Sequence, residues 1–198
     1  MCSRSNTRGR IPQNSTGKDR TKKHVFIFLA LYLLLAAPVA YGTEPAYKLG
    51  FSPNGESLQV ILHGIADAEE SILVAAYSFT SKSVAEALLA AHKRGVKVAV
   101  VADRKGNSGR YTAVNFLANH KVPVRLNGRY AILHHKFMVI DGTAVQLGSF
   151  NYSAAAANRN AENVLLLMDA PSIAAQYATE WKRLWEEGVD VKPGDLAR

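Results

Sequence analysis

Apolar runs of two different spacings constrain the fold of this chain more tightly than any other feature. Residues 71–79 and 96–102 are rich in apolar side chains, and the second run is nearly continuous, as in a strand covered on both faces. Residues 56–68 and 81–95 instead repeat apolar side chains at helical spacing. Together with a short strand near residues 47–51, the order is β-α-β-α-β. It predicts an α/β fold: a layered α/β/α sandwich with a mixed, mostly parallel central sheet.

The remaining segments continue the alternation of strands and helices. A basic loop is expected at 104–110, a helix at 111–119, a strand at 122–126, a hairpin of strands 137–140 and 144–147 around an Asp-Gly turn, a helical turn at 154–157, a strand at 164–168 and a closing helix at 173–187. No internal repeat or low-complexity linker interrupts this order.

Polar side chains at the ends of short apolar runs form the candidate site. His134 and Lys136 are two residues apart, so on an extended strand they point the same way. Ser149 and Asn151 have the same spacing, and Glu162 follows. A neutral imidazole beside an ammonium suits attack on an anionic centre, because the lysine neutralises charge that would repel the nucleophile. The hydroxyl and the amide can donate to the same anion, and the carboxylate can accept the second imidazole N–H.

The spacing of this stretch resembles the HKD signature of the phospholipase D superfamily. The matching residues fall in three groups: His134, Lys136 and Asp141, then Gly148, Ser149 and Asn151, then Glu162. The chain carries one such motif, as the small bacterial endonucleases of that superfamily do, whereas the large lipid-cleaving members carry two. The resemblance extends from Tyr47 to about Glu187. Asp141 begins an Asp-Gly turn, and we expect it to be a structural residue of the motif rather than a participant in chemistry.

The resemblance implies a mechanism and a homodimer. One motif supplies one histidine, whereas cleavage of a phosphodiester needs a nucleophile and an acid. Two copies of the motif would therefore face each other across one site. His134 of one protomer would form a phosphohistidine, and His134 of the other would protonate the leaving oxygen. Lys136 and Asn151 would bind the non-bridging oxygens, Ser149 would assist, and Glu162 would orient each imidazole.

Cysteine and histidine give little support for a metal centre, and the implied scheme needs no metal and no cofactor. The only cysteine, Cys2, lies near the N-terminus, so no disulfide is expected. No carboxylate cluster of metal-ligand spacing lies near the motif, although the adjacent His134 and His135 have the look of a ligand pair. The other histidines of the chain beyond the leader, taken as structural hydrogen-bonding residues, are His63, His92 and His120.

The first 42 residues are predicted to be a signal peptide. Basic residues at 18–23 precede an apolar run at 25–37, and the small residues Ala40 and Gly42 follow. An uncleaved anchor is the alternative, although the run is shorter than the roughly 20 residues that span a bilayer. We therefore expect a periplasmic or secreted protein with a single catalytic domain at 43–198, and no stable membrane association after cleavage.

Charge is informative through its distribution. The chain carries +8, but residues 1–42 supply +6 of it, which leaves 17 basic and 15 acidic residues beyond the leader. Residues 93–136 hold ten Lys and Arg against one acid. If that segment surrounds the site, its field favours a polyanion. Arg104, Lys105 and Arg110, at the carboxyl end of a predicted strand, are expected to touch substrate phosphates away from the cleavage point.

Together with what the resemblance implies, these patterns predict a secreted endonuclease that hydrolyses DNA, or RNA, at a site shared across a homodimer. Two alternatives stay open. A phospholipid phosphodiesterase acting on an anionic lipid such as cardiolipin would use the same chemistry, but no long apolar insert follows the leader to form a lipid-entry loop. A non-catalytic module that binds DNA in uptake or conjugation would not require an oriented nucleophile.

Overall fold

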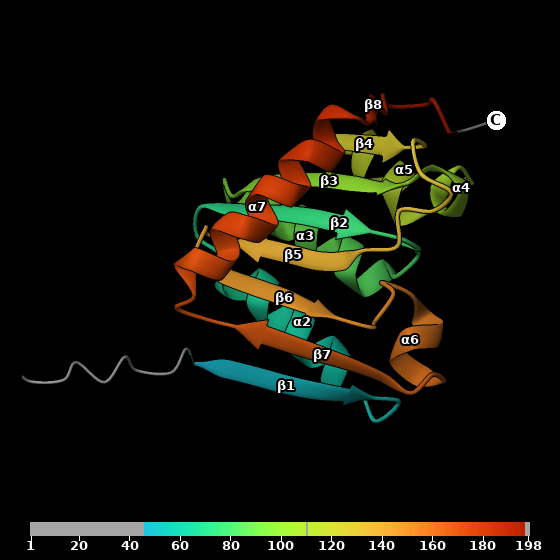
Figure 1. The fold of residues 1–198 in the computed structure, drawn as a ribbon. Coiled ribbons are helices and arrows are strands. Elements are labelled where there is room, and N and C mark those ends of the chain that lie inside the picture. The colour runs from blue at the N-terminus through green and yellow to red at the C-terminus, as the bar shows by residue number, and fades with distance from the viewer. Residues whose placement is uncertain (1–45, 110, 197–198) are drawn as a thin grey trace, which may run out of the picture. The chain divides into compact units, whose positions relative to one another are not determined.

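A computed structural model describes residues 46–109 and 111–196, so the predicted leader and Arg110 lie outside the described residues. An eight-stranded mixed sheet runs through this part of the chain (Figure 1) in the order β1-β7-β6-β5-β2-β3-β4-β8. The strands are β1 (Tyr47–Ser52), β2 (Ser71–Ala76), β3 (Lys97–Asp103), β4 (Val124–Asn127), β5 (Lys136–Ile140), β6 (Ala144–Gly148), β7 (Glu162–Leu167) and β8 (Val189–Asp190).

Helices cover both faces of the sheet, which confirms the predicted α/β sandwich. Helices α2 (Glu56–Asp67), α3 (Lys82–Lys93) and α5 (Ala113–Asn119) share one apolar core with the sheet, and α7 (Pro171–Glu186) packs in a second core on the opposite face. Figure 1 shows α7 crossing in front of the strands with α2 and α3 behind them. The short helices α4 (Arg104–Asn107) and α6 (Ala154–Asn158) lie at one end of the sheet.

The prediction of a mostly parallel sheet is wrong. Five of the seven strand pairings are antiparallel, and only β2–β3 and β3–β4 are parallel. The reason is connectivity. Helical crossovers place neighbouring strands in parallel only from β2 to β3 and from β3 to β4, whereas β5 and β6 form a hairpin and β7 runs back beside β6.

Local sequence explains where the predicted elements begin and end. The side chain of Ser81 accepts a hydrogen bond from the backbone N–H of Val84 at 3.4 Å and caps α3, and Gly95, with φ of 100°, ends it. Strand β3 is buried on both faces, as its apolar run predicted. On the opposite face, the indole of Trp181 donates to the carbonyl of Val74 at 2.9 Å and fastens α7 to the middle of the sheet.

Two elements differ from the sequence prediction. The expected basic loop begins with a helical turn, α4, because the carboxylate of Asp103 accepts from the backbone N–H of Gly106 at 2.8 Å. The other oxygen of Asp103 accepts from the backbone N–H of Leu133 at 2.8 Å and fixes the segment that leads to His134. Strand β8, two residues long, was not predicted. Across residues 46–109 and 111–196 we find no helix with the length and apolar character needed to cross a membrane.

Candidate active site

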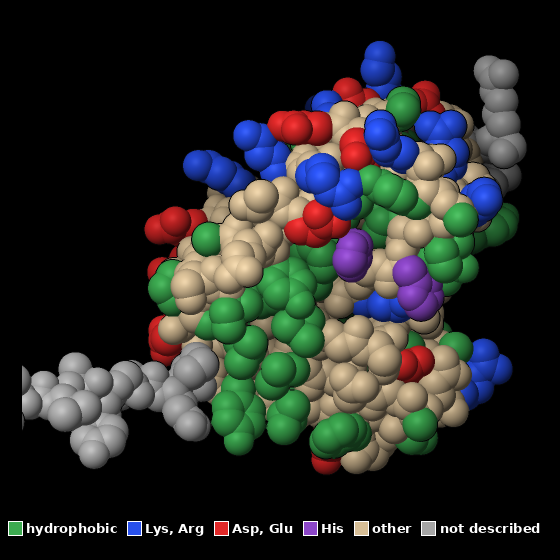
Figure 2. Space-filling model, in the orientation of Figure 1, with side chains coloured by type: hydrophobic (Ala, Val, Ile, Leu, Met, Phe, Trp, Pro, Cys, Tyr) green, Lys and Arg blue, Asp and Glu red, His purple; other side chains and the backbone are tan. Residues whose placement is uncertain are grey.

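The candidate site lies at one end of the sheet, where strands of opposite direction meet. The amino ends of β5 and β7 and the carboxyl end of β6 adjoin there because these strands are antiparallel. They surround a cavity of about 450 Å³ lined by ten residues: His134, His135, Lys136, Phe137, Leu147, Gly148, Ser149, Asn151, Glu162 and Tyr177. The five residues predicted for the site are all in this set. Figure 2 shows histidine side chains beside a hollow on this face, with a basic group at its base.

His134 and Lys136 meet at the start of β5. His134 is exposed in the segment before the strand, and Lys136, the first strand residue, is only 9% exposed. The Lys136 ammonium donates to the carbonyl of His134 at 2.8 Å and lies 5.3 Å from the ring centre of Tyr77. The rings of Tyr77 and His134 are 4.8 Å apart. Tyr77 therefore supports both residues, and its position directly after the apolar run of β2 was the available sequence signal.

Burial shifts the titration of Lys136. Desolvation lowers the pKa of its ammonium, and the negative charge of Glu162 opposes that shift. A cation held in a partly dehydrated cavity interacts more strongly with an anion than a cation in water. The cavity is therefore built to receive a negatively charged group beside the exposed imidazole.

Glu162 and Ser149 are bound to each other rather than to the imidazole. The Ser149 hydroxyl donates to Glu162 Oε2 at 2.6 Å and accepts from the backbone and side-chain N–H groups of Asn163 at 3.1 and 3.3 Å. The side chain of Asn160 donates to Glu162 Oε1 at 3.0 Å. Within the described chain no hydrogen bond joins Glu162 to His134, so the predicted orienting contact is not formed. Both carboxylate oxygens already have donors, and Asn160 was not singled out from the sequence.

Asn151 and Gly148 shape the opposite wall. The side-chain oxygen of Asn151 is buried, and no group of the described residues donates a hydrogen bond to it. This acceptor calls for a hydrogen-bond donor on a ligand, whereas the side-chain NH₂ group of Asn151 is the part that can donate to an anionic oxygen. Gly148 has φ of 146°, and a Cβ there would lie 2.2 Å from the carbonyl oxygen of Asn163. Only glycine lets β6 approach β7 closely enough to bring Ser149 to Glu162.

Asp141 lies outside the cavity and has a structural role. Its carboxylate accepts three backbone N–H groups, from Glu69 at 2.9 Å and from Glu70 and Ser71 at 2.8 Å. Burial alone would raise the pKa of this carboxyl, but the three hydrogen bonds outweigh it and lower the pKa. Asp141 thus joins the β5–β6 turn to the start of β2. It takes no part in the cavity.

The predicted basic residues do not line the cavity. The side chain of Arg104 packs over Gly128, and the ammonium of Lys105 donates to the carbonyl of Ala131 at 3.2 Å. Both residues therefore lie on α4 beside the segment that leads to His134. Arg110 is outside the described residues. Among the residues with described positions, no group of three or more His, Cys, Asp or Glu side chains is arranged to hold a metal ion.

Comparison with known proteins identifies the family. The family described as "Cardiolipin synthase, PLD-like domain" matches residues 61–185. The chain therefore belongs to the phospholipase D superfamily, whose members are phosphodiesterases, and the resemblance inferred from the motif is confirmed.

Individual relatives carry different names. The phospholipase D of Rickettsia conorii is 36% identical over 131 residues, which cover 66% of this chain and 65% of that protein. The mitochondrial cardiolipin hydrolase of Xenopus laevis is 36% identical over 127 residues, 64% of this chain and 60% of that protein. The chain thus spans less than two thirds of the length of these curated relatives. The crystal structure of Nuc, a phospholipase D family member from Salmonella typhimurium, matches with a TM-score of 0.74 and 38% identity over 75% of this chain and 99% of Nuc.

Proposed function

We propose that this protein is a nuclease that hydrolyses phosphodiester bonds of nucleic acid through a phosphohistidine. One observation carries the proposal: the buried ammonium of Lys136 and the exposed imidazole of His134 open into the same cavity of about 450 Å³. The ammonium attracts the phosphate and offsets the charge that would repel a nucleophile. The imidazole supplies that nucleophile.

The cleavage proceeds in two displacements at phosphorus. In the first, an imidazole nitrogen of His134 bonds to phosphorus, the ester P–O bond breaks, and an imidazolium protonates the leaving oxygen. In the second displacement, water attacks phosphorus and gives a proton to the imidazole that protonated the leaving oxygen, and the P–N bond breaks. Lys136 and Asn151 hold the non-bridging oxygens in both steps. Ser149 and Asn160 keep the Glu162 carboxylate at the cavity rim, where it stabilises cationic imidazole.

The second imidazole comes from a second copy of the chain. An apolar patch beside the cavity supports a homodimer: Tyr47, Leu49 and Phe51 on β1 are each more than half exposed on one side of the strand. They adjoin their cross-strand neighbours Leu167 and Leu165 on β7. Figure 2 shows this apolar patch over β6, β7 and β1, next to the hollow. A partner seated on it would bury the patch and bring its own His134 toward the cavity.

Charge favours nucleic acid over lipid, whereas likeness to known proteins supports both. The match to Nuc extends over nearly all of that chain and supports a nuclease. Arg104 and Lys105 lie on α4 beside the segment that leads to His134, where a polyanion approaching the cavity would meet them, whereas Arg129 in that segment is paired with Glu187 at 3.5 Å. A phospholipid hydrolase is the second candidate, because relatives of similar identity are named phospholipase D and cardiolipin hydrolase.

The decisive assay compares the wild type with His134→Ala on plasmid DNA and on cardiolipin vesicles, at matched phosphodiester concentration and in EDTA. His120→Ala, an exposed histidine on α5's carboxyl end, is the matched control. DNA degradation by the wild type and the control, lost in His134→Ala, is expected. Hydrolysis of cardiolipin with intact DNA would overturn the nuclease proposal in favour of lipid. Binding of DNA without cleavage of any diester would support a non-catalytic module instead.

Subunit mixing tests the shared site. Wild type and His134→Ala are unfolded together, refolded at varied ratios and assayed at constant total protein. If each site needs one His134 imidazole from each of its two chains, activity falls as the square of the wild-type fraction. A linear fall would mean that each chain acts alone and would refute the shared site.

We further propose export to the periplasm or the medium. The basic segment 18–23, the apolar run 25–37 and the small residues that follow it support a cleaved leader. Amino-terminal sequencing of the protein recovered from the periplasm is expected to begin at Thr43. Recovery of the full-length chain in the membrane fraction would favour the uncleaved anchor.

A further inference from the structure

A second cavity adjoins the first at the catalytic imidazole. It has a volume of about 460 Å³ and is lined by Tyr130, Ile132, Leu133, His134, His135, Arg183 and Leu184. It lies between the segment that leads to His134 and the carboxyl half of α7. Both cavities include His134 and His135 in their walls, so a ligand bound at the first can extend into the second. The proposed reaction places no group of the substrate in this second cavity.

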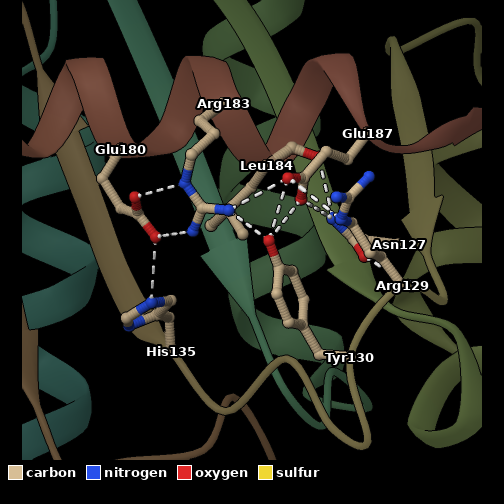
Figure 3. Close-up of polar contacts among 8 residues, drawn as sticks. All are labelled: Asn127, Arg129, Tyr130, His135, Glu180, Arg183, Leu184 and Glu187. Carbon is tan, nitrogen blue, oxygen red and sulfur yellow. Dashed lines mark hydrogen bonds and ion pairs between the residues drawn. The ribbon is translucent and has the colours of Figure 1, made fainter.

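Arg183 is the lining residue with a permanent charge. Carboxylates around it already neutralise that charge. Its guanidinium donates to both oxygens of Glu180 at 2.9 and 2.6 Å and to Glu187 at 3.0 Å, and it also contacts the hydroxyl of Tyr130. Figure 3 shows these groups as one chain of contacts along α7. The hydrogen bonds from Arg183 and from Tyr130 lower the pKa of Glu180 and of Glu187 respectively, so both carboxylates stay charged. A second phosphate would therefore find no uncompensated cation here.

The same contacts hold the cavity open in a fixed shape. The Tyr130 hydroxyl donates to Glu187 at 2.7 Å, and the ring of His135 lies 3.4 Å from Glu180. These two links attach the segment to α7 at Tyr130 and at His135 (Figure 3), which come before and after Ile132 and His134 in the sequence. The guanidinium of Arg183 lies over the ring of Tyr130, 5.5 Å from its centre, and both residues line the cavity.

We propose that this second cavity is a subsite for a nucleobase next to the scissile phosphate. The inference rests on the proposed nuclease function and adds to it where the substrate is held. The scissile phosphate occupies the cavity of Lys136, and one of its neighbouring nucleosides enters the second cavity, with its base against Ile132 and Tyr130. An uncharged, planar group with polar edges fits a neutralised wall of aromatic, guanidinium and imidazole groups.

An acyl chain fits the same space poorly. Of the aliphatic lining residues, Leu133 and Leu184 are 2% and 1% exposed, and only Ile132, at 46%, offers substantial apolar surface. Since apolar binding scales with the apolar area buried, one isoleucine gives a hydrocarbon chain little to gain. A base gains from the π faces and the polar groups as well.

The test removes the base and the wall separately. Short single-stranded oligonucleotides carry an abasic sugar on the 5′ or on the 3′ side of one phosphodiester, and cleavage at that bond is compared with the same bond flanked by bases. The proteins are the wild type, Ile132→Ala and the matched control Val189→Ala, an exposed aliphatic residue of β8 that is not among the lining residues. For the wild type and the control we expect cleavage about tenfold slower with the abasic sugar on one side only. For Ile132→Ala we expect that difference to shrink to less than about threefold, because base and wall act as a pair.

Three results would contradict the proposed base subsite. Equal cleavage of all three oligonucleotides by the wild type would refute the subsite while leaving the nuclease function standing. No cleavage of any of them would remove the nuclease function and the subsite with it. A loss in Ile132→Ala of phospholipid vesicle hydrolysis, with oligonucleotide cleavage unchanged, would assign the cavity to lipid and overturn the proposal.

Discussion

Replacing Asp141 by Asn should destabilise the fold without removing the chemistry. The carboxylate accepts three backbone N–H groups from the residues before and at the start of β2, at 2.8–2.9 Å. Asparagine has the same shape and tolerates the φ of 51° found here, so the substitution adds neither a cavity nor backbone strain. Its single acceptor oxygen cannot serve all three donors, and its NH₂ group must face at least one of them.

The expected cost follows from those three bonds. A hydrogen bond to a charged group contributes about 1.5–3 kcal/mol when buried, and two of the three here are exposed to solvent, so we count about 1 kcal/mol for each. The free energy of unfolding should fall by about 2–3 kcal/mol, and Tm by about 5–10 °C. Urea unfolding monitored by circular dichroism measures this. Asp169→Asn is the matched control, since Asp169 is exposed and also has a positive φ, of 53°.

The loss should depend on pH in one direction. Because the folded-state pKa of Asp141 is lowered, its stabilisation is fully present above the unfolded-state pKa of about 3.9 and is lost as pH falls through the folded value. The stability gap between wild type and Asp141→Asn should therefore be constant near pH 7 and close below about pH 4. Hydrolysis of a small activated diester at 20 °C should stay within about threefold of wild type. A folded variant with activity reduced more than about a hundredfold would refute the structural role, and so would a gap that persists unchanged in acid.

Two further substitutions probe the cavity walls. Gly148→Ala should lower the free energy of unfolding by about 2–4 kcal/mol, because its Cβ would lie 2.2 Å from the carbonyl oxygen of Asn163 at a φ of 146°. Gly142→Ala, whose Cβ would have nothing near it, should lower that free energy by about 1 kcal/mol. Equal melting temperatures of the two variants would contradict this expectation. Lys136→Met should reduce diester hydrolysis by about a thousandfold. The melting temperature should stay unchanged or rise, because burial of the ammonium costs desolvation energy that methionine avoids. A large loss of stability would mean that Lys136 is structural.

The sequence was most informative where structure depends on neighbours along the chain. Caps such as Ser81 and the alternation of apolar runs located nearly every strand and helix, and two-residue spacings brought His134 and Lys136, and Ser149 and Asn151, to one cavity. Direction in the sheet was harder to predict, because a connection of similar length can lead to a parallel or an antiparallel partner. The two-residue β8 pairs with β4 across more than sixty residues and has no local signature.

Contacts between distant segments account for the rest of what sequence reasoning missed. Tyr77 follows β2 and His134 precedes β5, and the separation of the two residues along the chain does not predict their contact. The links from Tyr130 to Glu187 and from His135 to Glu180 depend on how α7 crosses the sheet. Glu162 lies in the predicted cavity, but its hydrogen-bond donors are Ser149 and Asn160 rather than the imidazole of His134.

In the proposed reaction, one chain supplies the cation and the nucleophile, and a second copy supplies the acid for the leaving oxygen. Lys136 would supply one cation for the one negative charge of a diester, and His134 would supply the nucleophile, since both line the cavity. Among the lining residues described, the other imidazole, His135, is directed to Glu180 on α7, and the Ser149 hydroxyl is committed to Glu162 at 2.6 Å. If the proton comes from a second copy, the rate per chain must fall when the protein is diluted below the dissociation constant of the dimer, even at saturating substrate. A chain that kept its full rate at every dilution would need an acid of its own, and the hydroxyl of Tyr177, which lines the same cavity, would be the first candidate.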